Sequence, residues 1–518
     1  MTTDHDLFPT GTAGLDPVSR PQEVRLADGD HLSLSIAPVR KDLRDDDPGS
    51  GGSAARLRML AYNGSIPGPT LRVRQGAEIT VDVRNDGDVE TTVHWHGLRL
   101  ENRFDGVPHE TQEPIPVGGG HRYRVQFPDA GFYWYHPHIR EDFAQEMGLY
   151  GTIVVDPADP GYWPPVDREL TLTLDDLLVE DGHVAAFHRS GPDSTAMGRF
   201  GNVLLVNGET AFAGTATAGE VVRLYLVNTA NTRLFDVALR GARMKLVGGD
   251  SGRYERETFV DDVLLAPSER AVVDVLFDAP GQVRLEHRTP ERVRDLGMFT
   301  VAPDDRGRSP AAGAYAALRV DPDLTAEHRL LDAELDRPPD KVLAFVSKMT
   351  MTMDTDMDMD MHGGGGGGHD HDGPHGHGDG LEWEDTMPEM NRASDPSTMV
   401  WQLVDGETCA VNGAIDWAFT VGDRVKIRLV NDMDQDHPMH HPFHVHGAGR
   451  FLVLSRDGTP EQNLVWKDTV LLRAGQTVDV LLDVSNPGLW MAHCHIAEHT
   501  ESGMMFSFTV ARRPEPVR

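Results

Sequence analysis

Hydrophobic and polar residues alternate along most of the chain, in short runs separated by Gly, Pro, Asn and Asp. Such runs, rich in Val, Thr and aromatic residues, are typical of the strands of β-sandwiches. One pattern occurs three times: Asn-Gly, a short β-rich run, a Gly, and a strand that ends in Asn nine residues after that Gly. The three copies are NGSIPGPTLRVRQGAEITVDVRN from Asn63, NGETAFAGTATAGEVVRLYLVN from Asn207 and NGAIDWAFTVGDRVKIRLVN from Asn412.

A second half follows each copy, in which an alternating strand, a Pro-Gly or Ala-Gly turn and another strand succeed one another. The second halves contain FPDAGFYWYHPH, FDAPGQVRLEH and VSNPGLWMAHCH. The length of 518 residues also predicts roughly three domains, because a domain has about 150 residues. We therefore predict an all-β protein of three β-sandwich domains in tandem, at residues 1–157, 158–336 and 337–518.

One segment inside the predicted third domain breaks the pattern. Residues 349–380 read MTMTMDTDMDMDMHGGGGGGHDHDGPHGHGDG, with six consecutive glycines and no branched apolar residue. Because such a composition cannot build a core, we predict an exposed, mobile insertion. It follows the strand KVLAFVS and precedes the third copy of the repeat.

The charge balance narrows the classes of partner. With 48 basic and 82 acidic side chains, the net charge of -34 disfavours nucleic acid and anionic membranes. It indicates either a surface that favours solubility or one that attracts cations. No stretch approaches the roughly 18 consecutive apolar residues that span a bilayer. The N-terminal MTTDHD has no basic patch before an apolar run, so we expect a cytoplasmic protein, or a periplasmic or extracellular one if a signal was removed.

Four His-x-His pairs carry the candidate chemistry. They are His94/His96, His136/His138, His444/His446 and His493/His495. On a strand, residues two apart point to the same face about 6.5 to 7 Å from each other, so each pair offers two neighbouring imidazoles. The pairs occur only in the first and third repeats, and docking these two sandwiches would gather eight imidazoles in one cavity. The middle repeat, which ends in VRLEH, has no pair, and we interpret it as a spacer without metal.

A second candidate site surrounds one of the two cysteines. Cys409 and Cys494 could form a single disulfide, but Cys494 lies between two histidines, which favours a metal thiolate. Two imidazoles, a thiolate and a thioether form the site that holds blue copper, and the third repeat offers His441, Cys494, His499 and Met504. Because side chains alternate on a strand, Cys494 faces away from His493 and His495. The sequence HCH therefore joins the two candidate sites.

The motifs HWHG, HPH, HPFHVHG and HCHIAEHTESGM resemble the four copper motifs of the multicopper oxidases. The resemblance covers most of the chain and implies three cupredoxin-like Greek-key β-sandwiches. It also implies an enzyme with four copper ions, which takes single electrons from a reduced donor at type 1 copper. Four of these electrons then reduce O2 to water at a cluster of three coppers.

The resemblance assigns a role to each motif residue. His94 and His444 match the type 2 ligands, and His441, Cys494, His499 and Met504 match type 1, with Met505 a poorer match. The two type 3 ions match His96, His136 and His495, and His138, His446 and His493. A Met at the axial position of type 1 implies a moderate potential.

Two carboxylates are expected to supply protons. Asp105, in RFDG, matches a carboxylate that the family keeps near the cluster, although a turn aspartate before Gly106 is the simpler alternative. Close bacterial relatives have Glu directly after the second type 1 histidine, where this chain has Thr500. We expect Glu501 to take that role through water, or proton delivery to be slower.

Six methionines from Met349 to Met361, and five histidines from His362 to His377, resemble the Met-rich insertion of copper-efflux oxidases, which oxidise Cu(I) to Cu(II). Thioethers prefer Cu(I), and Met349 and Met351 of this segment are candidate ligands for substrate copper. The resemblance adds Met439, two residues before His441, where copper-efflux oxidases have a methionine that binds substrate copper. The family's substrate aspartate aligns with His437, so that site is only partly reproduced. The alternative is a disordered loop with incidental metal affinity.

The resemblance leaves the donor open. Phenols, aromatic amines and Cu(I) are the expected donors, with bilirubin, Mn(II) and Fe(II) as further options and copper detoxification as a possible role. Aromatic donors are expected at an exposed edge of His441 or His499, and a monomer suffices. A non-enzymatic copper-binding cupredoxin protein is the alternative class, but it would lack Cys494 or several histidines. A copper nitrite reductase would have fewer catalytic histidines.

Overall fold

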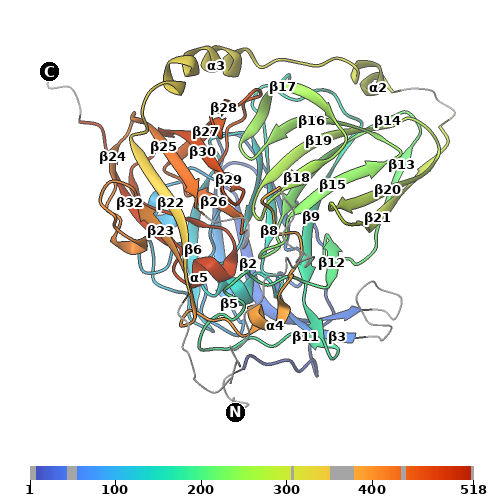
Figure 1. Cartoon of the computed structure of the whole chain (residues 1–518). Coiled ribbons are helices and arrows are strands. Elements are labelled where there is room, and N and C mark those ends of the chain that lie inside the picture. The colour runs from blue at the N-terminus through green and yellow to red at the C-terminus, as the bar shows by residue number, and fades with distance from the viewer. Residues whose placement is uncertain (1–6, 44–54, 305–308, 350–378, 433–438, 515–518) are drawn as a thin grey trace, which may run out of the picture.

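The computed structural model describes residues 7–43, 55–304, 309–349, 379–432 and 439–514. Strands dominate it, and three pairs of β-sheets follow one another along the chain. The prediction of an all-β protein with three tandem sandwiches is confirmed. In Figure 1 the second sandwich, in green, lies to the right of the third, in orange and red, and the blue strands of the first lie below them.

The first sandwich has two sheets of four strands. One contains, in spatial order, β1 (Glu23–Arg25), β4 (Thr70–Arg74), β8 (Gly151–Asp156) and β7 (Gly131–Tyr135). The other contains β3 (Ala55–Tyr62), β2 (His31–Leu43), β5 (Glu78–Asn85) and β6 (Gly120–Gln126).

The second sandwich has sheets of six and five strands. The larger contains β12 (Val203–Val206), β9 (Arg168–Leu177), β14 (Glu220–Asn228), β19 (Arg270–Phe277), β16 (Arg243–Gly249) and β17 (Gly252–Val260). The smaller contains β13 (Phe212–Thr217), β21 (Val293–Ala302), β20 (Gly281–Arg288), β15 (Phe235–Arg240) and β18 (Val263–Leu265). A hairpin of β10 (Val179–Glu180) and β11 (His183–Val184) precedes β12.

The third sandwich repeats the strand order of the second. Its larger sheet contains β23 (Met399–Asp405), β22 (Lys341–Met349), β25 (Arg424–Asn431), β30 (Thr477–Val484), β27 (Gly449–Arg456) and β28 (Thr459–Pro460). Its smaller sheet contains β24 (Ala418–Thr420), β32 (Met505–Ala511), β31 (Gly488–Cys494), β26 (His441–Val445) and β29 (Thr469–Leu472). The internal repeat of the sequence is thus a repeat of topology.

The repeated segments form equivalent strands. Each Gly-to-Asn run contains an inner strand of its sandwich, namely β5, β14 or β25, and each pairs in parallel with the first long strand of its repeat. The alternation of side chains along a strand explains which residues of β2 are buried, since exposed and buried residues alternate over most of its length. The predicted boundaries fall between β8 and β9 and after α3 (Pro322–Leu335), and their positions stay predictions.

Helices are short and lie in the connections. They are η1 (Asn102–Phe104), α1 (Glu141–Ala144), α2 (Pro310–Ala314), α3, α4 (Pro388–Arg392), η2 (Asn412–Ala414) and α5 (Ala497–Glu501). At the top of Figure 1, α2 and α3 lie on the connection from the second sandwich to the third. Leu324 and Leu331 of α3 pack against leucines of β27 and β30, which anchors that connection.

The methionine-rich insertion lies between two neighbouring strands. β22 ends at Met349 and pairs antiparallel with β23, where Met349 is opposite Met399. Residues 350–378, for which we predict mobility, lie outside the described residues. The chain is described again at Asp379, whose carboxylate accepts a bond from Trp383 Nε1 at 3.2 Å.

Truncation of the middle core is expected to destabilise the protein. Leu226 of β14 is fully buried among apolar residues, so Leu226→Ala should lower the free energy of unfolding by about 2–5 kcal/mol. The matched control is Leu330→Ala, because Leu330 on α3 is 61% exposed and such a change costs within about 0.5 kcal/mol. Denaturant unfolding followed by circular dichroism measures both, and equal losses would contradict the assignment of this core.

Candidate metal centre

Eight histidines of the first and third sandwiches line one buried seam. They are His94, His96, His136 and His138 from the first, and His444, His446, His493 and His495 from the third, all at most 5% exposed. Backbone pairing aligns them. β26 runs antiparallel to β31 and places His444 opposite His493, and a bridge joins His94 to His136 through N–H···O distances of 2.8 and 3.2 Å.

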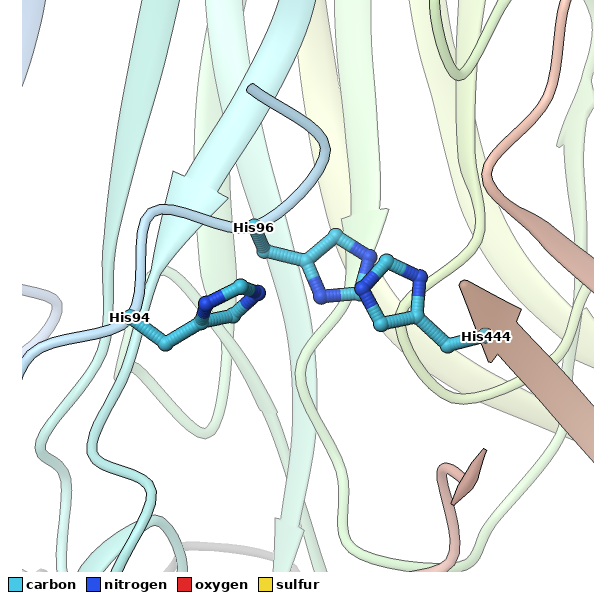
Figure 2. Close-up of side chains that lie close together, drawn as sticks. All are labelled: His94, His96 and His444. Atoms are coloured by element: carbon cyan, nitrogen blue, oxygen red, sulfur yellow. The ribbon is translucent and has the colours of Figure 1, made fainter. Parts of the chain in front are cut away.

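Figure 2 shows three of these imidazoles approaching from opposite sides. His94 and His96 come from the connection between β5 and β6, and His444 comes from β26. The rings of His96 and His444 stack with centroids 3.8 Å apart, and His94 lies 5.7 Å from His96. The docking of the two outer sandwiches, which the sequence predicted, therefore brings the pairs together.

The ring nitrogens fall into three groups whose ligand atoms lie within 4.8 Å of one another. The groups are His94, His96 and His444; His96, His136 and His495; and His138, His446 and His493. The last two match the two predicted type 3 triplets. His94 and His444, the predicted type 2 ligands, share their group with His96.

Hydrogen bonds on the outer side of the seam decide which nitrogen seven of the eight rings present. Six rings face an acceptor with Nδ1, which must therefore carry the hydrogen. The acceptors are the carbonyl oxygens of Asp105, Pro137, Asp468 and Cys494 for His94, His136, His444 and His493, and the carboxylates of Asp105 and Glu141 for His446 and His138. His96 is reversed, because its Nε2 donates to Asp468 Oδ1 at 3.1 Å.

The inner nitrogens are left with lone pairs that point at one another. Nε2 of His446 lies 3.3 Å from Nε2 of His138 and 3.2 Å from Nε2 of His493. Since all three hydrogens are on Nδ1, none can lie between these atoms, and a cation removes the repulsion. Among the described residues, Nε2 of His94, His136 and His444 and Nδ1 of His96 have no partner either. The residues present therefore fit bound metal ions.

Burial lowers the pKa of six of the eight imidazoles and favours their neutral form, whereas carboxylates, Glu141 foremost, outweigh burial and raise the pKa of His138. Burial, with a contribution from His94, lowers the pKa of His446 to about 3, and burial lowers that of His495 to about 4. Neutral imidazole is the form that binds metal. The site is thus preformed for metal at neutral pH.

The second site lies in the third sandwich. Sγ of Cys494 lies 3.4 Å from Nδ1 of His441 and 3.8 Å from Nδ1 of His499, and all three side chains are fully buried. Burial raises the pKa of the Cys494 thiol, so a thiolate here needs a cation. Met504 is fully buried in the same apolar cluster and Met505 is half-buried, which favours Met504 as the fourth ligand.

The expectation that His441 or His499 offers an exposed edge is wrong. Both imidazoles are 0% exposed. Trp401 of β23 covers them, with its ring 4.4 Å from that of His499 in a stack and 4.8 Å from that of His441 edge-on. Its indole N–H donates to Thr195 O at 2.7 Å. An aromatic donor therefore cannot touch either ring directly.

Asp105 lies at the cluster, as predicted from the motif. Its Oδ2 accepts from Nδ1 of His446 at 2.7 Å, and its Oδ1 has no hydrogen-bond partner among the described residues. Although burial alone would raise it, the pKa of Asp105 is held below its ordinary value by His446 and His94. The carboxylate is therefore a charged acceptor.

Glu501 is connected to the cluster through another residue, Glu141. Its Oε1 accepts from the backbone N–H of Glu141 at 2.9 Å, and it is Glu141 that contacts Nδ1 of His138, at 2.8 Å. Burial, Asp142 and Glu141 raise the pKa of Glu501 to about 8. Thr500, at the position of the expected Glu, donates to the carbonyl of Cys494.

Three contacts to these sites escaped the sequence reasoning. Glu141 has the nearest local signal, because it is an acidic residue only three positions after His138, at the first position of helix α1. Asp468 holds His96 and His444 but lies outside every motif. Trp401 also has no local signal, since it comes from a separate strand.

The three methionines predicted for substrate copper are not joined by any described contact. Met439 is buried in the core of the third sandwich. Met349 ends β22, and its side chain lies outside what the structure describes, as does all of Met351. His437 is also outside the described ranges.

Family models described as multicopper oxidase match residues 51–160, 168–284 and 384–514, which together make up more than half of the chain. The chain belongs to the multicopper oxidase family. The multicopper oxidase MmcO of Mycobacterium tuberculosis is 28% identical over 514 residues, covering 91% of this chain and 85% of that protein. A copper resistance protein A homolog of Pseudomonas syringae pv. tomato is 25% identical over 532 residues, covering 86% of this chain and 88% of the homolog.

Solved structures agree with this membership. The crystal structure of a multicopper oxidase from Pseudomonas thermotolerans matches with a TM-score of 0.66 and 26% identity, covering 94% of this chain and all of that chain. As a multicopper oxidase, this protein binds copper and oxidises reducing substrates with O2. The prediction of an enzyme is confirmed, and the alternative of a non-enzymatic copper-binding protein is not supported. No helix in the described ranges is long and apolar enough to cross a membrane.

Removal of the charge on Asp105 is expected to slow this multicopper oxidase. In Asp105→Asn an amide oxygen can still accept from His446, but the carboxylate is lost. Because outer contacts of metal ligands are worth about 10–100-fold, O2 uptake should fall by about that factor at unchanged protein stability. Asp129→Asn is the control, since Asp129 pairs with Arg99 and touches no histidine of the seam. Equal rates for the two variants would contradict a role for Asp105.

Proposed function

We propose that this multicopper oxidase holds four copper ions, one of type 1, one of type 2 and two of type 3. The proposed type 1 ligands are His441, Cys494, His499 and Met504, and the proposed type 2 ligands are His94 and His444. The type 3 ions take His96, His136 and His495, and His138, His446 and His493. The support is the grouping of the ring nitrogens and the thiol.

When bound, type 1 copper accepts single electrons and the other three coppers use four of them to reduce O2 to water. The chain contributes a short path between the two sites. Cys494 lies between His493 and His495, so covalent bonds of three consecutive residues join the thiolate to two imidazoles. Asp105, Glu141 and Asp468 hold imidazoles of the cluster as carboxylate acceptors.

We propose Cu(I) as the preferred donor, with phenols and aromatic amines as poorer ones. The observation that carries this choice is the full burial of His441 and His499 under Trp401. A planar aromatic donor is kept from both imidazoles. A cuprous ion needs only soft ligands nearby, and thioethers provide them.

The position of the methionines supports the same choice. The methionine-rich segment connects β22 to β23, and β23 carries Trp401. Carboxylates interleaved with the methionines attract cations in a chain of net charge -34. A copper resistance protein A homolog among the relatives is in keeping with a role in copper detoxification.

Substitution of the methionines tests the donor. A variant carries Leu in place of Met351, Met353, Met357, Met359 and Met361, which keeps the length and charge of the segment. Because Leu has no thioether to bind Cu(I), oxidation of Cu(I) at low concentration should fall by at least about tenfold. A tenfold fall corresponds to about 1.4 kcal/mol of donor binding. O2 uptake measures it, and oxidation of a phenolic dye, measured in parallel, should be unchanged. Equal Cu(I) rates in both proteins would identify a laccase-like enzyme instead.

The two cysteines allow a matched test of the type 1 site. Cys494→Ser removes the thiolate, so the intense visible absorption of blue copper and donor oxidation should both be lost, while the type 2 electron paramagnetic resonance signal remains. Cys409→Ser should change neither, since Cys409 is exposed. Blue absorption in Cys494→Ser would rule out this site.

A further inference from the structure

Arg270 begins strand β19 of the middle sandwich and is fully buried where the three sandwiches meet. A guanidinium has five N–H donors, and here each has an acceptor. Nε donates to Phe132 O of the first sandwich at 3.1 Å. The carbonyl oxygens of Ser268 and Asp250 accept at 3.1 and 3.2 Å, and the two carboxylate oxygens of Asp468 accept at 2.6 and 2.5 Å. The side chain is fully satisfied and therefore fixed.

Asp468, the partner from the third sandwich, in turn holds two imidazoles of the copper seam. Its Oδ1 lies 3.1 Å from Nε2 of His96. Its carbonyl oxygen accepts from Nδ1 of His444 at 2.9 Å. One residue thus contacts a histidine from each outer sandwich, and it is 2% exposed.

His96 is the ring whose orientation needs this help. Among the seam histidines that have an outer partner, it alone donates through Nε2 and presents Nδ1 inward. An ionised carboxylate only accepts, so Asp468 fixes the hydrogen on Nε2 and leaves the Nδ1 lone pair free. Nδ1 has no other partner among the described residues.

Gly97 shows how closely Asp468 and Arg270 pack against the backbone next to His96. It follows His96 and has a φ of +83°, and a Cβ there would lie 2.5 Å from Asp468 Oδ2 and 2.8 Å from Arg270 Nη2. Only glycine leaves room for the carboxylate and the guanidinium against the backbone of the HWHG motif. The motif therefore contains a contact to the middle sandwich.

We propose that Arg270 is a positioning residue of the copper cluster, which holds Asp468 so that His96 presents Nδ1 to the metal. The inference rests on the proposed three-copper cluster. The middle repeat has no His-x-His pair and was expected to be a spacer. On this proposal it supplies the cation on which one ligand from each outer sandwich depends.

Substitution of Arg270 tests the proposal, with a matched buried arginine as control. Arg270→Gln should reduce the affinity for cluster copper by about 10–100-fold, as loss of an outer contact of metal ligands does. Copper per chain, the type 2 paramagnetic signal and the near-ultraviolet absorption of the type 3 pair should fall, while the visible type 1 absorption stays. Arg223→Gln also breaks a buried two-bond pair in the same sheet, with Asp274 at 2.8 and 3.0 Å, but touches no histidine of the seam.

A second variant keeps the proposal testable if Arg270→Gln does not fold. Gly97→Ala leaves both charges in place but displaces the pair, and it should give the same selective loss of cluster signals. Gly29→Ala is its control, because Gly29 has a φ of +82° and nothing within 4 Å of an added Cβ. The two substitutions therefore share backbone strain and differ only in the contact.

The outcomes separate this inference from the proposed function. Wild-type protein without cluster signals would overturn the four-copper assignment itself. Wild-type signals that persist undiminished in Gly97→Ala and in folded Arg270→Gln would overturn the role of Arg270. Loss of the same signals in Arg223→Gln and Gly29→Ala would do so too, because it would trace the effect to stability alone.

Discussion

Repulsion among imidazole lone pairs is the constraint on which the arrangement of the two outer sandwiches depends. Nitrogens 3.2–3.3 Å apart with no hydrogen between them are unfavourable unless a cation lies among them. The protein maintains this arrangement with acceptors behind seven of the eight rings, which direct the hydrogens of those rings outward. Four of the rings come from the first sandwich and four from the third, so bound metal would also link these two sandwiches.

Much of the fold and of the metal site was predictable from the sequence, because the responsible signals are local. Alternation places His493 and His495 on one face and Cys494 on the other, and the repeated Gly-to-Asn runs became equivalent inner strands. The pairing of imidazoles within each His-x-His motif also follows from spacing, since residues two apart on extended backbone share a face, whereas the division into ligand groups came from the resemblance to the family's copper motifs.

The outer contacts were not predictable, because they depend on tertiary packing. Asp468 reaches His96 across 372 residues, and Arg270 reaches Asp468 from another sandwich. Trp401 covers His441 and His499 from β23, and two further strands, β24 and β25, separate β23 from β26 along the chain. Only Glu141 lay within reach of a local argument.

If the donor is Cu(I), as proposed, the position of the methionine-rich insertion separates donor capture from copper binding. It lies in the connection between two adjacent strands, β22 and β23, ahead of α4, and the antiparallel register of these strands is set by their own pairing. The entropy of closing a loop grows only with the logarithm of its length, so this connection can lengthen, shorten or change composition at little expense to the sandwich. No ligand of the proposed copper sites lies on either strand. On the proposed function, the donor side of the enzyme is therefore a replaceable segment, while the oxygen side is fixed by contacts among all three sandwiches.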